Sequence, residues 1–440
     1  MTFFASPHLS RRAAGAALAC ILAAQVAVAQ STAGTEHWVG TWATAAVVRP
    51  PVRPASPGQA APQQPAQPAP FTINNQTLRQ IVHVSVGGSR ARVVLTNAFG
   101  TAPLSIGAAQ VALRESDAKI VPASNRTLTF DGRPSVTIPT GGLMFSDPVN
   151  LTVPSMSDLA IDLFLPGDLR DANLTSHFGA NQTNYASNTG NFAGAADFPV
   201  SATTPSWFFL ERVEVAAPAQ VGAVIAFGDS ITDGTRSTPN TDHRWPDQLA
   251  KRLLAKPGGV QGVLNEAIAG NRLLTEANIP FGINALARFD RDVLGQTGAT
   301  HMIVLEGIND IGMARQPPGP SAEDLIAAHR QLIERAHAHG LKIYGCTLLP
   351  YEGAAYFTAD GEAKRQALNN WMRTSKAYDA VIDFDALVRD PQNPTKIQAQ
   401  YDSGDHLHPN DAGYQAMGGA IDLKLFESGT VQAPAKAKRR

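Results

Sequence analysis

The sequence predicts two structured parts, a β-sandwich-like part followed by a three-layer α/β/α part with a parallel sheet. Residues 71–215 alternate polar and apolar side chains at the period of β-strands and lack helical periodicity. After residue 219, short apolar runs alternate with stretches of helical spacing, which indicates a parallel sheet covered on both faces. The length of 440 residues also exceeds what one ordinary core can hold.

The chain is expected to divide at three changes of composition. The predicted segments are a signal peptide at 1–29, a β-rich domain at 30–217 with a Pro-rich loop at 49–70, an α/β domain at 218–428 and a basic tail at 429–440.

In the β-rich domain, residues 77–86 and 90–97 both alternate polar and apolar side chains. Gly87-Gly88 lies between them, so the pair predicts a β-hairpin. Further strands are expected at 135–138, 158–164 and 207–215.

The α/β domain contains residues that typically start and end helices between its predicted strands. Ser321 is a candidate N-cap, and Gly340 is placed to end the helix that Ser321 begins. The expected strands are 221–227, 301–305, 343–349 and 381–384, and the expected helices are 243–255, 321–339 and 410–425.

Composition limits the possible partners. Hydrophobic residues make up 44% of the chain and charged residues 17%, as in globular proteins, and the net charge is −1. The body of the sequence has no cluster of basic residues, so we expect no nucleic-acid partner. The basic cluster at the C-terminus is interpreted as a solvated tail.

The N-terminus has the features of an export signal. Arg11 and Arg12 precede an apolar run at 13–24, and Ala27-Val28-Ala29 offers a cleavage site. We therefore expect a secreted or periplasmic protein. The run is too short to span a bilayer comfortably, so no stable membrane insertion is expected. Ser10-Arg11-Arg12 leaves Sec and twin-arginine export both open.

The cysteines predict neither a disulfide nor a metal site. Cys20 lies inside the signal, which leaves Cys346 alone after processing, in an apolar strand-like run. A buried, unreactive thiol is the expectation. Because no Cys/His cluster has zinc-ligand spacing, we expect no structural metal.

A candidate nucleophile follows the first strand of the α/β domain. Gly228-Asp229-Ser230 would place a serine on a tight turn at the carboxyl end of that strand, where active sites of α/β sheets gather. The alternative is a turn in which Asp229 and Ser230 only cap backbone groups.

A candidate base precedes the last helix. Asp405 and His408 are three residues apart, so one loop can present an imidazole together with the carboxylate that orients it. His406 is the competing histidine and is expected to be an ordinary loop residue. Asp402 is the weaker rival to Asp405.

Two further segments offer donors for an oxyanion. Gly270 can bring its backbone N–H close to a substrate, and Asn309 can offer its side-chain amide. Taken singly, the two segments are more simply explained as a glycine turn and an Asx turn.

Taken together, the four segments resemble the SGNH hydrolase family, also called GDSL-type esterases and lipases, over about residues 219–428. The resemblance implies Ser230 as nucleophile, Asp405 and His408 as its partners, and an oxyanion hole formed by Ser230, Gly270 and Asn309. The β-rich region with Gly40-Thr41-Trp42-Ala43-Thr44 looks like that of secreted family members with an extra β domain.

The expected function is a secreted serine esterase that acts through an acyl-enzyme and needs no cofactor. Its expected substrate is a small-molecule or polysaccharide ester, with acetyl or other short acyl groups on carbohydrate as the first choice. A lipase or lysophospholipase is the alternative enzyme, and a carbohydrate- or surface-binding protein with a vestigial hydrolase domain is the non-enzymatic one. The oligomeric state stays open. The short connection at 216–219 predicts a packed interface between the domains.

Overall fold

The computed structural model describes residues 1–2, 36–51, 71–256, 259–276, 281–314 and 319–427. All but the first two residues of the predicted signal peptide, all but the first three residues of the Pro-rich loop, and the whole basic tail lie outside the described residues. From Trp38 onward the described chain belongs to one compact unit. None of the helices in these ranges is long and apolar enough to cross a membrane.

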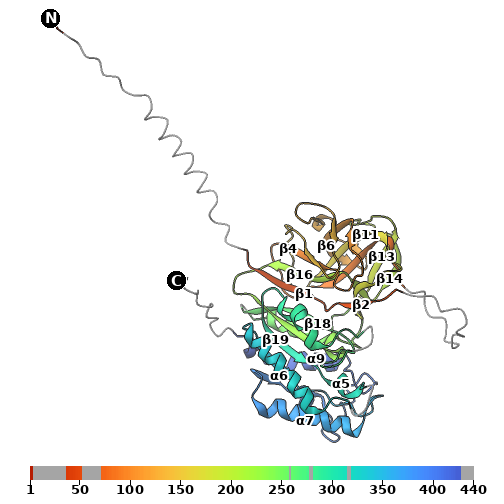
Figure 1. Ribbon diagram of the computed structural model, residues 1–440, viewed down its shortest axis with the longest axis vertical. Helices are drawn as coiled ribbons and strands as arrows, with labels where there is room; N and C mark the ends of the chain where they lie inside the picture. Colours follow the sequence, from red (N-terminus) through yellow and green to blue (C-terminus); the bar gives the residue numbers. More distant parts are fainter. Residues whose placement is uncertain (3–35, 52–70, 257–258, 277–280, 315–318, 428–440) are drawn as a thin grey trace, which may run out of the picture. The chain divides into compact units, whose positions relative to one another are not determined.

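The first part of this unit, residues 38–216 and here called the β part, is built from antiparallel sheets (Figure 1). One sheet has the order β1-β16-β4-β10, and a larger one has the order β14-β13-β3-β11-β6-β7 with β8 also paired to β6. Smaller sheets are β15-β12-β2 and β5-β9. The strands are β1 (Trp38–Ala43), β2 (Val47–Arg49), β3 (Asn74–His83), β4 (Ala91–Thr96), β5 (Leu104–Ile106), β6 (Ala108–Ser116), β7 (Lys119–Ile120), β8 (Arg126–Leu128), β9 (Val136–Ile138), β10 (Leu143–Phe145), β11 (Asp158–Asp168), β12 (Leu174–Phe178), β13 (Asn184–Thr189), β14 (Val200–Thr204), β15 (Ser206–Phe208) and β16 (Leu210–Ala216), with a 3-10 turn η1 (Pro122–Ser124).

The two larger sheets share one hydrophobic core. Leu95 on β4 and Val213 on β16 are fully buried in the same cluster as Leu78 on β3 and Leu163 on β11. Alternate residues of each strand point into this core, which explains the alternation that predicted a β-sandwich.

The predicted hairpin of residues 77–86 and 90–97 is wrong. β3 pairs with β11 and β13, whereas β4 pairs with β16 and β10, so the two strands lie in different sheets. The two glycines between them allow close packing of backbone rather than a tight turn. A Cβ atom on Gly87 would lie 2.4 Å from the carbonyl oxygen of Val153, and one on Gly88 would lie 2.6 Å from that of Ala216.

The second part, residues 218–427 and here called the α/β part, contains the predicted parallel sheet, in the order β18-β17-β19-β20-β21. Its strands are β17 (Gly222–Gly228), β18 (Val260–Ala267), β19 (Ala299–Leu305), β20 (Lys342–Cys346) and β21 (Ala380–Ile382). Its helices are α2 (Ser230–Asp233), α3 (Trp245–Leu254), α4 (Ala285–Phe289), a π-helical turn η2 (Asp290–Leu294), α5 (Ile308–Gly312), α6 (Ala322–Ala338), α7 (Ala359–Ser375), α8 (Phe384–Val388), α9 (Asp411–Ala420) and a 3-10 turn η3 (Leu423–Phe426).

The helix predicted at 321–339 is α6, and Ser321 is its N-cap. The Ser321 hydroxyl accepts from the N–H of Asp324, whose carboxylate accepts from the N–H of Ser321 in return. The helix predicted at 410–425 is interrupted instead. α9 stops at Ala420, and Asp422 caps the separate turn η3. Helix α7 was not predicted from the sequence.

The β part and the α/β part are packed together, as the short connection predicted. The N–H of Gly40 on β1 donates to the carbonyl of Thr297 at 2.9 Å, and Thr44 forms a parallel bridge with Asn265 on β18. A Cβ atom on Gly262 would lie 2.5 Å from the carbonyl oxygen of Gly40. The edge strand of the parallel sheet is therefore covered by β1 rather than by solvent.

Candidate active site

Ser230 lies where β17 ends and α2 begins. The preceding Asp229 is fully buried, and its Oδ1 atom accepts from the N–H of Ile231 at 2.9 Å, which fixes the turn. Burial raises the pKa of Asp229 to about 7. A Cβ atom on Gly228 would lie 2.3 Å from Oγ1 of Thr232, so only glycine fits there. The capping role of Asp229 is therefore real, and it leaves the Ser230 hydroxyl available for other contacts.

His408 reaches Ser230 from the loop before α9. Its Nε2 atom lies 2.8 Å from Oγ of Ser230, and its Nδ1 atom lies 2.8 Å from Oδ2 of Asp405. An imidazole held in this way can take the serine proton through Nε2 while the carboxylate stabilises the charge that develops on the ring. The structure thus brings together the three side chains that the sequence singled out.

Asp405 is held as a carboxylate by donors on its own loop. Its Oδ1 atom accepts from the N–H of Leu407 at 3.1 Å and from that of His408 at 2.9 Å. Burial opposes ionisation, but the hydrogen bonds from His408 hold the pKa of Asp405 well below its usual range. Arg236, which the sequence analysis missed, also donates to Oδ2 through Nε at 3.0 Å.

The competing residues of this loop pair with each other. Nδ1 of His406 lies 2.5 Å from Oδ2 of Asp402, and the His406 side chain is 52% exposed, against 13% for that of His408. The geometry thus favours His408 and Asp405 over His406 and Asp402 as partners of Ser230.

The two predicted oxyanion donors, Gly270 and Asn309, follow β18 and β19, the strands on either side of β17. Gly270 has φ +76°, and a Cβ atom there would lie 2.4 Å from the ring of Phe281, so both conformation and space require glycine. Within the described part of the chain, the backbone N–H groups of Ser230 and Gly270 have no hydrogen-bond acceptor. The side-chain amide of Asn309 donates one of its hydrogens to the carbonyl of Asn271 at 3.0 Å, which leaves its second hydrogen available to a substrate.

Asp310, the residue after Asn309, also helps to hold this region in place, although no role was predicted for it from the sequence. Asp310 is buried, and its two oxygens accept from the N–H groups of Leu273 and Leu274 at 2.6 and 2.9 Å. Burial raises the pKa of Asp310 to about 6, against the effect of these bonds. It ties the loop after Gly270 to the start of α5.

Arg288 lies fully buried beneath the candidate site. It donates to the carbonyl of Gly228 at 3.0 Å, to that of Glu266 at 2.6 Å and to Oδ1 of Asn271 at 2.8 Å. One guanidinium therefore links the ends of β17 and β18 to the loop after Gly270. The local sequence pattern around Arg288 does not predict that its side chain links these segments.

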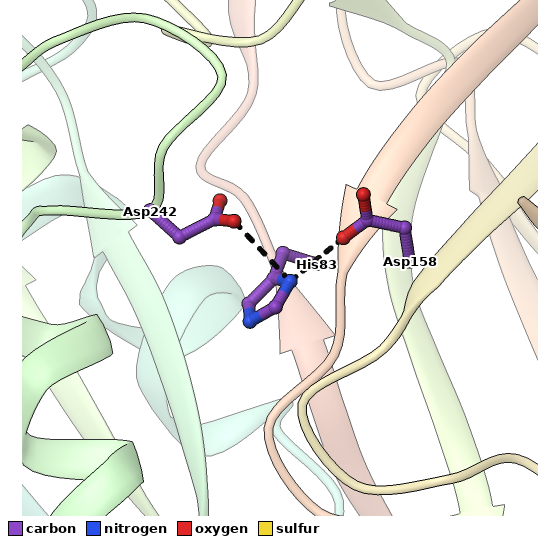
Figure 2. A group of neighbouring side chains, drawn as sticks. All are labelled: His83, Asp158 and Asp242. Atoms are coloured by element: carbon purple, nitrogen blue, oxygen red, sulfur yellow. Dashed lines mark hydrogen bonds and ion pairs between the residues drawn. The ribbon is translucent and has the colours of Figure 1, made fainter. Parts of the chain in front are cut away.

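One group of described residues offers donor atoms close enough together for a metal ion: His83, Asp158 and Asp242 (Figure 2). Nδ1 of His83 lies 2.7 Å from Oδ1 of Asp158 and 3.3 Å from Oδ2 of Asp242, and Arg114 donates to the other oxygen of Asp158 at 2.8 Å. Burial lowers the pKa of His83, but the hydrogen bond and the nearby carboxylates raise it overall. A proton on Nδ1 accounts for this arrangement without a metal.

Cys346 on β20 is fully buried, as predicted, and burial raises the pKa of its thiol well above the ordinary value. A thiol in this state is a poor nucleophile.

A comparison with family models indicates that the α/β part, with its parallel sheet, is a hydrolase domain. Residues 226–416 match the model of the GDSL-like lipase/acylhydrolase family. This part of the chain belongs to that family. No curated protein matches the sequence.

Similar solved structures include three bacterial hydrolases. A GDSL-like lipase from Bacteroides thetaiotaomicron is 20% identical, with 46% of this chain and 87% of that chain covered and a TM-score of 0.35. Est24, a carbohydrate acetylesterase from Sinorhizobium meliloti, is 15% identical, with 46% and 98% covered and a TM-score of 0.37. An aryl esterase from M. smegmatis is 16% identical, with 46% and 98% covered and a TM-score of 0.37.

Proposed function

We propose that this protein is a secreted serine esterase that hydrolyses carboxylic esters through an acyl-enzyme. The observation that carries the proposal is the pair of 2.8 Å contacts of His408, one to Ser230 and one to Asp405. Membership of residues 226–416 in an acylhydrolase family supports the same class of reaction.

In the proposed reaction, Oγ of Ser230 attacks the ester carbonyl while Nε2 of His408 takes its proton. The former carbonyl oxygen becomes negatively charged. Hydrogen bonds from the N–H groups of Ser230 and Gly270 and from the free amide hydrogen of Asn309 stabilise that charge. His408 then protonates the leaving alcohol, and water, activated by the same imidazole, releases the acid. Every proton moves through one ring nitrogen, so no cofactor is needed.

We infer that the substrate carries short acyl groups on a carbohydrate. Two features support this substrate class: the export signal proposed at residues 1–29, which would bring the enzyme to extracellular polymers, and the large β part beside the hydrolase domain. We expect neither a nucleic-acid partner nor insertion into a membrane.

Turnover of a chromogenic acetate ester by the full chain and by Ser230→Ala tests the reaction class. The proposal requires turnover that Ser230→Ala abolishes; no turnover by either protein favours a binding protein with a vestigial hydrolase domain. Acid release from acetylated polysaccharides and from phospholipids then tests the substrate class. Faster release from phospholipids would favour the lipase alternative.

A further inference from the structure

A buried histidine of the β part contacts the element that bears the candidate nucleophile. His177 lies on β12, its side chain is 2% exposed, and its Nε2 atom lies 3.1 Å from Oδ1 of Asp233 on α2. Its Nδ1 atom lies 2.8 Å from the carbonyl oxygen of Ala45. Because a carbonyl can only accept, Nδ1 carries the hydrogen of this contact, and Nε2 faces the carboxylate of Asp233.

Asp233 extends this contact to the other side of the candidate site. It is three residues after Ser230 on the same short helix, and its Oδ2 atom accepts from the N–H of Ala269 at 3.2 Å. Ala269 directly precedes Gly270. A continuous path therefore runs from β12 through α2 to the backbone that carries a proposed oxyanion donor.

Neighbouring contacts fix the end of α2 from the same side. Asn181, just after β12, donates to the carbonyl of Gly234 at 2.6 Å. Arg244 donates through Nε to the carbonyl of Asp233 at 2.6 Å and through Nη2 to the carbonyl of Ala180. The β part thus holds both the side chain of Asp233 and the backbone that follows it.

The imidazole itself has little freedom to move. The ring of Trp207 packs against it with centroids 5.7 Å apart, and the Trp207 indole donates to the carbonyl of Ile81 at 2.8 Å. Trp42 packs edge-on against Trp207 at 4.9 Å. A rigid aromatic cluster of the β part therefore sets the position of His177.

We propose that His177 is a positioning residue for the reaction: through Asp233 it fixes the turn that bears Ser230 and the loop that bears Gly270. The inference rests on the proposed function, because it assigns His177 to the same site. The β part would then contribute to catalysis by positioning the site. The donors of an oxyanion hole stabilise the transition state only when they are held in place before the reaction. A displacement of about 1 Å in such a site can cost about 10²-fold in rate.

Two matched substitutions of His177 separate this role from simple packing. In His177→Asn the amide can replace Nδ1 and keep the bond to Ala45 but is too short to reach Asp233. In His177→Gln the longer side chain can reach Asp233. We expect kcat on a small acetate ester to fall about 10²-fold in His177→Asn with KM little changed, and to recover in part in His177→Gln.

Two substitutions of Asp233 form a second matched pair, and their result does not depend on whether the His177 variants fold. In Asp233→Asn the new amide can donate to a neutral His177 and still accept from Ala269, so kcat should stay near wild type. Asp233→Ala removes both bonds and should match His177→Asn. The control is His337→Asn, since His337 forms a similar pair with Asp379 at 2.9 Å on the surface of α6.

Amide hydrogen exchange supplies a readout that needs no activity. The backbone amides of segments 229–235 and 267–271 should exchange faster in His177→Asn and Asp233→Ala than in wild type. Their exchange rates should be unchanged in Asp233→Asn and His337→Asn. Wild-type kcat and exchange in a folded His177→Asn would overturn the proposal, as would an Asp233→Asn variant as slow as Asp233→Ala. If the wild type hydrolysed no ester, the proposed function would fail, while the exchange rates would still decide whether His177 positions these segments.

Discussion

Nε of Arg236 and Nδ1 of His408 donate to the same oxygen of Asp405, at 3.0 and 2.8 Å. The carboxylate that orients the proposed base is thus shared with the guanidinium of Arg236. Because like charges repel, the guanidinium opposes the positive charge that His408 must carry during the reaction.

Arg236→Gln should therefore move the acid limb of the pH profile of kcat/KM to higher pH. The Arg236 side chain is 59% exposed, so solvent and salt screen it, and the shift should be about half a pH unit or less and shrink in high salt. Arg170→Gln, which breaks an exposed pair with Asp168, is the control. A shift toward lower pH would contradict the argument.

Ser230→Ala should reduce ester turnover by about 10³-fold or more, in line with losses on removal of a triad member. The melting temperature should change little, because the substitution removes one hydroxyl at a helix start. Thermal unfolding and turnover of the purified variant measure both. Residual turnover above about a thousandth of wild type, in a preparation free of other esterases, would count against Ser230 as nucleophile.

His408→Ala should lose as much turnover as Ser230→Ala, and the double variant should be little worse than either, since the two side chains act as a unit. His406→Ala should keep most of the activity, because His406 pairs with Asp402 and not with Ser230. The three variants and the double variant are compared on one acetate ester. Reversed behaviour of the two histidines would assign the base to His406.

The sequence was sufficient for those parts of the fold and site that local pattern determines. Alternating runs predicted the β part, and Ser321 marked the start of α6 because a cap is a local interaction. Ser230, Gly270 and Asn309 follow the strands β17, β18 and β19, which lie side by side in the sheet, so the structure brings their segments to one edge.

Contacts between distant segments could not be predicted in this way. Gly87-Gly88 has the composition of a hairpin turn, yet close approach of Val153 and Ala216 accounts for both glycines. Arg236 meets Asp405 across 169 positions, and His177 meets Asp233 across 56. No periodicity or motif encodes such pairs, because they depend on how whole elements pack.

The cluster of His83, Asp158 and Asp242 should make stability depend on pH. The folded-state pKa of His83 is raised above its ordinary value of 6.5, so its stabilising effect is fully present below that pH. It is lost as the pH rises through the folded-state value. The pKa of Asp158 is lowered despite burial, so its contribution is lost only toward acid, below about 3.8.

Melting temperatures of the wild type and His83→Gln between pH 5 and 9 measure this effect. The wild type should exceed the variant most at the acid end of this range and least at the alkaline end. Asp158 and Asp242 of the cluster, and Asp247 and Arg114 that face it, stay unchanged in the comparison. A constant difference across the range would show that the charge of His83 adds nothing to stability.

Residues 219–440 expressed alone should be poorly folded and inactive on a small acetate ester. Removing the β part would expose Leu264 on β18, which is fully buried and lies beneath Gly40. It would also take His177 away from Asp233, so the helix that bears Ser230 would lose a contact that holds it. Circular dichroism, solubility and turnover of the fragment test this, with coexpressed residues 30–217 as the attempt at rescue. A soluble fragment that cleaves the ester as fast as the full chain would show that the β part does not shape the site, and a separate binding module would then be the better description of it.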